Sequence, residues 1–490
     1  MAEQSGVVFP ETNGRRSTSA TGRGAVAAAL RDVDPIGARA AEQETNWRRD
    51  YLAHFRRLVE AGLLSPQAAR TIATDGLAEL HEQMQYVTPD GMSVRLNEVF
   101  AGGVSERPGT AHGFNTATLT GTGTAERELS LPYRGDRLTG DALRRQLESW
   151  VERGVVEPSL AQAVRDVMAN PDWLDLSDQR VVVLGAGAEM GPLQSLLRWG
   201  GDVVALDLPR PDLWKRVLGA AREQAGRLHV PATSGGGDLA DRAGADLLHQ
   251  LPEAADWIND FDGRLMLGNY VYADGATNVR VSMAVDALSA HLVRERPDTA
   301  LAFLATPTDV FAVPGAAVDF ATDAYSSRTV SKVLRRPLRV LSGGRLLQRN
   351  YAPGADPGIC DSLVPQQGPN YVLAKRLQRW RATVEREAGT EVSFKVAPPT
   401  RTRSVLKNRA LAAAYAGAHR FGIEVFEPAT SSTLMAALLV HDLRTATPHH
   451  EHPWQDEAFG AAHGGLWRCA YDPRSALGLA VVLGFGSARV

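Results

Sequence analysis

A glycine-rich turn between two short apolar runs constrains the fold of this chain more than any other feature. Residues 179–208 read QRVVVLGAGAEMGPLQSLLRWGGDVVALDL, which is an apolar run, a glycine turn, a helical stretch and a second apolar run. Apolar runs of this length bounded by glycine are typical of strands that are buried on both faces of a parallel sheet. The stretch therefore predicts a β-α-β unit.

Further apolar runs extend this pattern toward the C-terminus. The additional strand candidates are Arg264–Gly268, Ala300–Ala305, Val392–Val396 and Gly478–Gly484. Helical stretches separate them, so residues 176–490 are predicted to form an α/β fold, a doubly wound parallel sheet of Rossmann-like type. Residues 313–368 are rich in proline, glycine and arginine and interrupt the alternation of strands and helices. We interpret them as an insertion in this domain.

The N-terminal part of the chain has a different pattern of apolar residues. Residues 1–34 mix Gly, Ser, Thr and Arg without periodicity, which predicts a disordered leader. Residues 35–175 are predicted to form a mostly helical N-terminal region. Within it, residues 44–86 and 139–170 carry apolar side chains at three- and four-residue intervals, which is typical of amphipathic helices.

Composition excludes several classes of protein. The 53 basic and 56 acidic residues give a net charge of −3, so nothing favours a nucleic-acid or acidic-membrane partner. The longest apolar stretch, near Leu477–Phe485, is far shorter than the ~20 residues that span a bilayer. The two cysteines, Cys360 and Cys469, lack metal-ligand spacing, and no secretory signal is evident. We therefore expect a cytoplasmic protein.

The turn itself has the residues of a dinucleotide site, in the spacing GxGxxxG. Gly185 permits the tight turn, Gly187 lets the backbone approach a pyrophosphate, and Gly191 allows a helix to pack closely on the strand. The N-terminus of that helix would face the phosphates. Asp207 ends the next strand, 22 residues after Gly185, where its carboxylate can hold both ribose hydroxyls of NAD. Asp207 favours NAD over NADP, because its carboxylate would repel the 2′-phosphate of NADP. Arg210 lies nearby in the sequence and could accept that phosphate, so NADP is the alternative.

The same turn fits two other classes of protein. Methyltransferases that use S-adenosylmethionine also have a strand, a glycine-rich turn, a helix, a strand and an acid. They usually carry a further acid just before the turn, where this chain has valine and leucine. A Rossmann-like protein that binds a nucleotide without turning over a substrate is the other alternative.

A second motif, Tyr371 and Lys375 in QQGPNYVLAKRLQRWRA, has the spacing YxxxK. The four-residue step puts both side chains on one face of a helix. An ammonium group beside a phenol lowers the pKa of the phenol, so Tyr371 could exchange a proton with a carbonyl oxygen near neutral pH. The plain alternative is an amphipathic helix with an outward lysine.

These motifs together resemble a divergent member of the short-chain dehydrogenase/reductase superfamily. The resemblance rests on four features in chain order: the glycine turn with its acid, a Gly-Asn pair at 268–269, the YxxxK helix, and the Pro-Thr stretch of VSFKVAPPTRTRSV. It implies an NAD(P)-binding fold and hydride transfer between the nicotinamide and a carbonyl or alcohol carbon of a small molecule. It also implies a homo-oligomer.

The resemblance assigns catalytic roles to the matching residues. Tyr371 would be the general acid or base, and Lys375 would lower its pKa and bind the ribose. A hydroxyl is expected at the end of the strand before this helix, where Thr306 and Thr308 lie. Thr306 precedes Tyr371 by 65 residues, an unusually long separation, and Ser362 is a rival only nine residues away.

The resemblance also assigns residues around the cofactor. Asn278 lies on the predicted helix before the Thr306 strand, close to where the family has the asparagine of its proton relay. Asn269 matches the loop that passes the adenine ribose. Pro398 and Thr400 resemble the segment beside the nicotinamide, although Pro399 stands where glycine is usual.

A histidine-rich stretch, His449–His452 with His463 downstream, raises the question of a metal site. The flanking prolines indicate an irregular loop, and adjacent side chains in a loop do not converge on one ion without help from elsewhere. We expect no metal here, and a polar loop or the rim of a substrate pocket instead.

Overall fold

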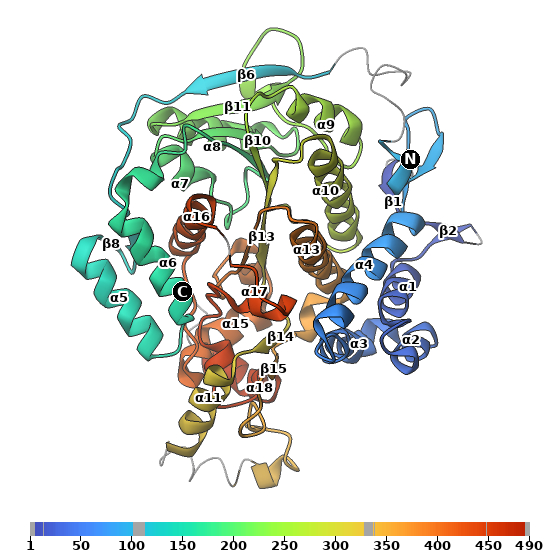
Figure 1. Cartoon of the computed structure of the whole chain (residues 1–490), viewed down its shortest axis with the longest axis vertical. Coiled ribbons are helices and arrows are strands. Elements are labelled where there is room, and N and C mark those ends of the chain that lie inside the picture. The colour runs from blue at the N-terminus through green and yellow to red at the C-terminus, as the bar shows by residue number, and fades with distance from the viewer. Residues whose placement is uncertain are drawn as a thin grey trace.

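A seven-stranded sheet forms the centre of the chain, seen edge-on in Figure 1. The computed structural model describes residues 5–12, 14–100, 113–327, 337, 339–446 and 448–485. In spatial order the strands are β16 (Val392–Val396), β13 (Ala300–Ala305), β12 (Leu265–Asn269), β9 (Arg180–Leu184), β10 (Asp202–Leu206), β11 (Arg227–Ala232) and β6 (Asn115–Thr120). Neighbouring strands are parallel, except that β6 pairs antiparallel with β11.

The strand order confirms the predicted fold class. Numbered along the chain, the parallel strands from β9 to β16 lie in the order 3-2-1-4-5-6, the order of doubly wound dinucleotide-binding folds. The predicted strands in the regions of β9, β10, β12, β13 and β16 are all present. The candidate strand at Gly478–Gly484 is wrong, because these residues belong to helix α18 (Pro473–Gly484). Asp472 caps this helix by accepting a hydrogen bond from the Ser475 N–H, a start signal that outweighs the apolar run.

Alternate residues of each strand enter one of two cores, because helices cover both faces of the sheet (Figure 1). Val182 and Leu184 of β9 enter the first core, whereas Val181 and Val183 enter the second. The first core is covered by α9 (Leu251–Asn259), α10 (Ala276–Glu295) and α13 (Pro369–Glu387). The second is covered by α6 (Pro158–Ala169), α7 (Leu193–Arg198), α8 (Pro211–Glu223) and α16 (Pro428–Arg444).

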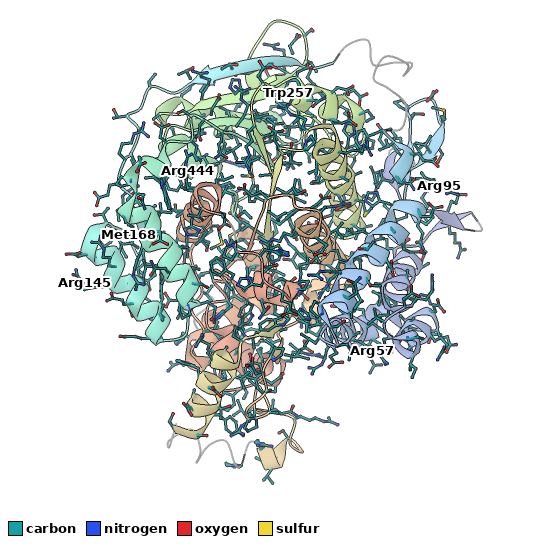
Figure 2. The ribbon with its side chains drawn as sticks, viewed as in Figure 1. Arg57, Arg95, Arg145, Met168, Trp257 and Arg444 are labelled. Atoms are coloured by element: carbon teal, nitrogen blue, oxygen red, sulfur yellow. The ribbon has the colours of Figure 1, made fainter. Side chains whose placement is uncertain are left out.

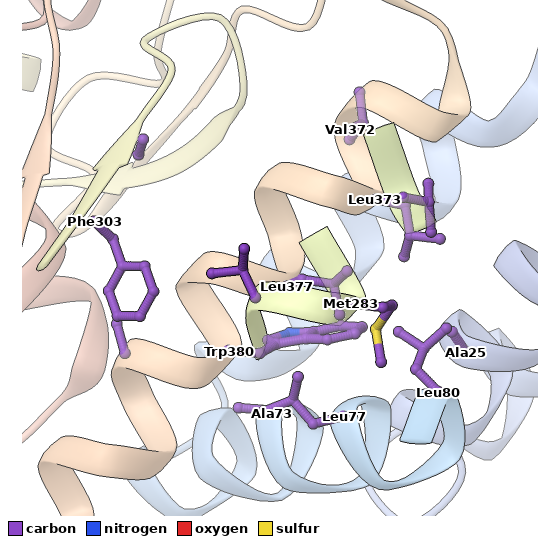
Figure 3. Close-up of a cluster of buried hydrophobic side chains, with 14 of the residues drawn as sticks. Ala25, Ala73, Leu77, Leu80, Met283, Phe303, Val372, Leu373, Leu377 and Trp380 are labelled. Atoms are coloured by element: carbon purple, nitrogen blue, oxygen red, sulfur yellow. The ribbon is translucent and has the colours of Figure 1, made fainter. Parts of the chain in front are cut away.

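The N-terminal helices contribute their buried faces to the first core. They are α1 (Thr18–Leu30), α2 (Pro35–Glu42), α3 (Trp47–Gly62) and α4 (Pro66–Gln83). Figure 3 shows the indole of Trp380 on α13 lying close to Ala73 and Leu77 of α4, with Met283 of α10 beside it. Gly76 makes this approach possible, because a Cβ there would lie 2.5 Å from the indole ring.

The expected disorder of residues 1–34 is not found in the described part of this segment. It contains β1 (Gly6–Val8) and α1, and Ala25–Leu30 are buried against the helices around them. A helix of small residues that is buried on most sides shows no amphipathic period, which is why its sequence resembled a leader. Residues 1–4 and 13 lie outside the described residues.

Strand β6 comes from the region that we expected to be mostly helical. It forms the edge of the sheet, and Trp257 of α9 donates a hydrogen bond from Nε1 to Thr116 Oγ1 of β6 over 2.9 Å. Figure 2 shows Trp257 at this edge among the other side chains. The further elements of this region are β4 (Gln85–Val87), β5 (Ser93–Arg95), β7 (Leu131–Tyr133), β8 (Asp136–Leu138) and α5 (Gly140–Glu152). Strands β2 (Glu11–Thr12) and β3 (Arg15–Arg16) belong to residues 1–34.

Strands β14 (Val310–Val313) and β15 (Gly358–Asp361) pair antiparallel at the two ends of the predicted insertion. The chain therefore leaves the β13–α13 connection and returns to it at neighbouring points. Between these strands lies α11 (Gly315–Ser327), and residues 328–336 and 338 lie outside the described residues. The C-terminal part adds α14 (Arg403–Lys407), α15 (Arg409–Gly417), α17 (Pro453–Ala458) and α18. No helix among the described residues is both long and apolar enough to span a membrane.

Candidate active site

A cleft of about 1470 Å³ lies at the carboxyl ends of the parallel strands. Its walls include the segments that follow β9, β10, β12, β13 and β16. The strand order reverses at β9, next to β12, which is where doubly wound folds bind ligands. The cleft exceeds the ~300–1,000 Å³ of typical small-ligand pockets, so it has room for a dinucleotide and a second molecule. Ten of the predicted site residues line it: Gly185, Gly187, Asp207, Asn269, Asn278, Thr306, Tyr371, Lys375, Pro398 and Thr400.

The glycine turn follows β9 directly but differs from the prediction at its end. Gly185 has φ +89°, and a Cβ there would lie 2.9 Å from the Tyr270 carbonyl oxygen, so glycine is needed for the turn itself. Gly191 does not line the cleft, and a Cβ there would meet its nearest neighbour at an ordinary 3.4 Å. Helix α7 begins only at Leu193 and has six residues, so the turn is longer than the expected one.

Asp207 joins the end of β10 to the glycine turn. Its Oδ2 accepts a hydrogen bond from the Gly187 N–H over 2.8 Å, and its Oδ1 accepts one from the Leu208 N–H over 2.7 Å. Burial raises the pKa of Asp207 more than these bonds and the nearby Arg210 and Arg216 lower it. Both arginines line the same cleft. This corner therefore offers a carboxylate for ribose hydroxyls and guanidinium groups that suit a phosphate.

A chain of hydroxyl groups ends at Tyr371, in the first turn of α13. Gln367 Nε2 donates a hydrogen bond to Thr308 Oγ1 over 2.7 Å, and Thr308 Oγ1 lies 2.9 Å from Thr306 Oγ1. Thr306 lies close to Tyr371 and acts to lower the pKa of its phenol. The rival Ser362 does not line the cleft, and its hydroxyl lies within hydrogen-bond distance of the Pro307 and Asp309 carbonyl oxygens, at 2.8 and 2.9 Å. Of the candidate hydroxyls, Thr306 is therefore the one that acts on Tyr371.

The expected lowering of the Tyr371 pKa is not found. Burial is the largest influence and raises this pKa, and the negative charge of Asp309 raises it further. Lys375 is itself desolvated, which lowers its pKa to about 8. Its Nζ donates to the Leu304 carbonyl oxygen over 3.1 Å and to Gln378 Oε1 over 3.2 Å. At neutral pH the phenol of Tyr371 is therefore protonated, the form that donates a proton.

Buried ion pairs hold the threonine segment against α13. Asp309 Oδ1 accepts a hydrogen bond from Arg376 over 3.0 Å, and its Oδ2 accepts one from Arg379 over 2.9 Å. The Ser362 N–H donates to the Asp309 carbonyl oxygen over 3.3 Å, just beyond the β14–β15 pair. This pairing explains how Thr306 can lie beside Tyr371 despite 65 intervening positions. Charged residues on a helix gave no sequence signal for such a role, because they usually face solvent.

Both predicted asparagines accept hydrogen bonds from the backbone of the loop after β12. Asn269 Oδ1 accepts a hydrogen bond from the Val271 N–H over 3.3 Å, and Asn278 Oδ1 accepts one from the Ala273 N–H over 3.1 Å. Among the described residues the amide nitrogens of both side chains have no hydrogen-bond acceptor, so they can donate to a bound molecule. In the Pro-Thr segment, Thr400 Oγ1 lies 2.8 Å from the Pro398 carbonyl oxygen and 2.7 Å from a serine hydroxyl of α16.

The histidine-rich stretch lies away from the cleft lining. His450 Nδ1 lies 2.7 Å from Asp456 Oδ1, and His463 Nε2 lies 3.0 Å from Glu157 Oε1. Arg468 also donates to Glu157, and hydrogen bonds from both basic partners outweigh burial and lower the Glu157 pKa to about 2. Within the described ranges, no group of three or more potential ligands is arranged to hold a metal ion.

Sequence reasoning missed Tyr415 of α15, which also lines the cleft. Burial raises its pKa, and the neighbouring Tyr371 raises it further. No motif marked this residue, because its place near Tyr371 depends on how α15 folds back over the cleft.

Comparisons with known proteins add little. No protein-family model matches the chain, and no curated protein does. One similar solved structure is a thiolation-reductase di-domain from an archaeal non-ribosomal peptide synthetase, with a TM-score of 0.28 and 10% sequence identity. The match covers 55% of this chain and 68% of that chain. The Rossmann-like assignment rests on the strand order of the sheet itself.

Proposed function

We propose that this chain is an NAD(P)-dependent oxidoreductase of short-chain dehydrogenase type, acting on a small carbonyl or alcohol substrate. One observation carries the proposal: the glycine turn, Asp207, and the Thr306–Tyr371 pair line a single cleft at the switch point of the sheet. A protonated phenol backed by a hydroxyl chain is equipped to donate a proton to a carbonyl oxygen.

The residues of the cleft suit a nicotinamide cofactor. The turn residues that line the cleft, Gly185 and Gly187 to Met190, would hold the pyrophosphate. Asp207 keeps lone pairs beyond its two backbone hydrogen bonds, enough to accept from ribose hydroxyls. Lys375 would bind the other ribose. Its ammonium group has three N–H donors, and among the described residues two of them have acceptors, so one remains for a ribose hydroxyl. Asn269 would line the adenine ribose.

The Pro398–Thr400 segment would lie beside the nicotinamide, which supplies or accepts a hydride when the cofactor is bound. Tyr371 would then donate a proton to the substrate oxygen or remove one from it. Thr306 would stabilise the phenolate that forms, and Thr308 would in turn hydrogen-bond to Thr306. The free amide nitrogen of Asn278 would donate to the relay. Positioning and proton transfer together would provide the catalysis.

Binding and activity tests separate this proposal from its alternatives. Purified protein is titrated with NADH, NADPH and S-adenosylmethionine, with thermal shift and fluorescence as readouts. We expect a reduced nicotinamide cofactor to bind, NADH more tightly than NADPH, and Asp207→Ala to weaken NADH in particular. Binding of S-adenosylmethionine alone would identify a methyltransferase instead.

Tyr371→Phe tests catalysis separately from binding. In an oxidoreductase it lowers kcat by about 10²- to 10⁴-fold while the cofactor still binds. Nicotinamide binding without turnover of any carbonyl compound, in both the wild type and the variant, would identify a nucleotide-binding protein that is not an enzyme. The resemblance also leads us to propose a homo-oligomer, which light scattering would test.

A further inference from the structure

A second, apolar pocket adjoins the cleft. It has a volume of about 70 Å³ and lies among α15, α18 and the segment that leads from β15 toward α13. The two spaces share part of their walls: Thr308, Val364, Pro399, Leu411 and Tyr415 line both. The smaller pocket is therefore a side pocket of the proposed active site.

The side pocket opens next to the reacting groups. Thr308 forms a hydrogen bond with Thr306, and Thr306 lies near enough to Tyr371 to influence its pKa. All three residues line the cleft. Tyr415, on the shared wall, lies close enough to Tyr371 for its pKa to be raised. If Tyr371 and Thr306 hold the carbonyl oxygen of a substrate, one substituent of the carbonyl carbon would thus point past Thr308 and Tyr415 into the side pocket.

The surface of the side pocket is almost entirely apolar. The groups that line only this pocket include Ala414, Phe421, Ile423, Leu466 and Ala476. Two polar side chains at its edge already have partners. Ser362 lies 2.8 Å from the Pro307 carbonyl oxygen, and Arg474 donates to Asp361 over 2.9 Å. A hydroxylated or charged substituent would lose its water here without new hydrogen bonds, whereas an apolar one gains from burial.

The helices on both sides of the side pocket are in backbone contact, so its walls are fixed. A Cβ at Gly417 of α15 would overlap the carbonyl oxygen of Ala480, and one at Gly484 of α18 would overlap that of Ala413. Because α15 and α18 already touch at these points, the helices have no room to move together and fill the space between them.

We propose that this side pocket binds an apolar substituent of the substrate. The substrate class is then a ketone, an aldehyde or the corresponding alcohol with an aliphatic chain or a ring beside the reacting carbon, rather than a sugar. This inference rests on the proposed function, because it locates the pocket relative to Tyr371.

A homologous series of methyl ketones, from 2-butanone to 2-decanone, tests the inference on the full chain with its preferred reduced cofactor. We expect kcat/KM to rise by about fourfold per added methylene until the pocket is full, as about 0.8 kcal/mol per buried methylene requires. Hydroxyacetone serves as the polar comparison and should be a poor substrate. Equal rates across the series, or a preference for hydroxyacetone, would overturn the inference.

Two variants on the same helix localise the effect. Ala414 lines the side pocket, whereas the neighbouring Ala412 lines neither space. We expect Ala414→Leu to lower the preference for 2-heptanone over 2-butanone by about 16-fold, the loss of roughly two methylenes of burial. Ala412→Leu should leave this preference unchanged. Ala476→Val on α18 fills the pocket from the opposite wall, in case Ala414→Leu does not fold. An unchanged preference in both filling variants would contradict the inference.

A binding measurement without turnover separates this inference from the proposed function. The fluorescent probe N-phenyl-1-naphthylamine is bound to the full chain and displaced by 1-butanol, 1-hexanol and 1-octanol. Displacement that strengthens with chain length and is lost in Ala414→Leu supports the side pocket even if no ketone is reduced. Ketone reduction without any dependence on chain length would support the proposed function alone, and failure of both assays would reject both.

Discussion

Replacing Asp309 by asparagine should destabilise the chain and disturb the candidate active site together. Asp309 is 1% exposed and holds Arg376 and Arg379, which are each 4% exposed, through hydrogen bonds of 3.0 and 2.9 Å. Asparagine keeps the size of the side chain but removes its charge. Arg379 retains Glu457 as a partner, whereas Arg376 has no other carboxylate within ion-pair distance among the described residues.

The size of the effect follows from the buried positive charge that remains. Removing one partner of a buried ion pair costs about 3–5 kcal/mol, because the other charge is left without compensation. Unfolding entropy is about 2.1 cal/mol/K per residue, so cooperative unfolding of 490 residues converts this cost into a fall in Tm of about 3–5 °C. Thr306 and Thr308 precede Asp309 on the same segment, so the hydroxyl chain to Tyr371 should loosen as well.

Thermal unfolding followed by circular dichroism measures the predicted change. The matched control is Asp319→Asn, which changes an exposed aspartate on α11 and should alter stability by less than about 0.5 kcal/mol. A Tm for Asp309→Asn within one degree of wild type would refute the reasoning, because Arg376 would then have to be solvated or paired elsewhere. Once a substrate is known, kcat should fall in this variant more than cofactor affinity does.

Further predictions test packing and titration. Gly76→Ala should destabilise the chain by about 1–3 kcal/mol in urea unfolding, because the added Cβ would meet the Trp380 ring at 2.5 Å. The control Gly219→Ala, on a helix with open space at that position, should instead stabilise it by about 0.5–1 kcal/mol. The Glu157 pKa of about 2 in the folded chain lies below its ordinary 4.5, so about 3 kcal/mol of stability should be lost as pH falls from about 4.5 to 2. Urea unfolding across this range should show a weaker pH dependence in Glu157→Gln, and equal dependence would contradict the assignment. Lys375 has a pKa of about 8, so affinity for a reduced nicotinamide cofactor should fall as pH rises through 8, and Lys375→Met should bind weakly at every pH.

The fold class could be predicted from the sequence because its signals are local. Each buried strand is a short apolar run, and the turn after β9 needs glycine at Gly185, where φ is +89°. The start of α4 is also marked locally, by the Ser65 cap and the proline that follows it. Such features depend on residues a few positions apart, so they can be recognised without knowing which segments pack against them.

The errors arose where the environment of an element decides its structure. The alanine-rich α1 has no amphipathic period because it is buried on most sides, and α18 has an apolar run that fits a strand equally well. Strand β6 has the alternation of an edge strand, but only its pairing with β11 assigns it to the main sheet. Pairings of this kind join residues more than 100 positions apart.

The sequence by itself determined the parallel sheet, the glycine turn with Asp207, and the YxxxK helix. Tertiary structure alone decided that Thr306 is the hydroxyl beside Tyr371, because the β14–β15 pair brings the chain back to the β13–α13 connection. It also decided that the arginines of α13 are buried and that the pKa of Tyr371 is raised rather than lowered. The physical reason is that desolvation and charge pairing depend on every segment packed around a group, whereas apolar periodicity and turn geometry depend only on its neighbours in the chain.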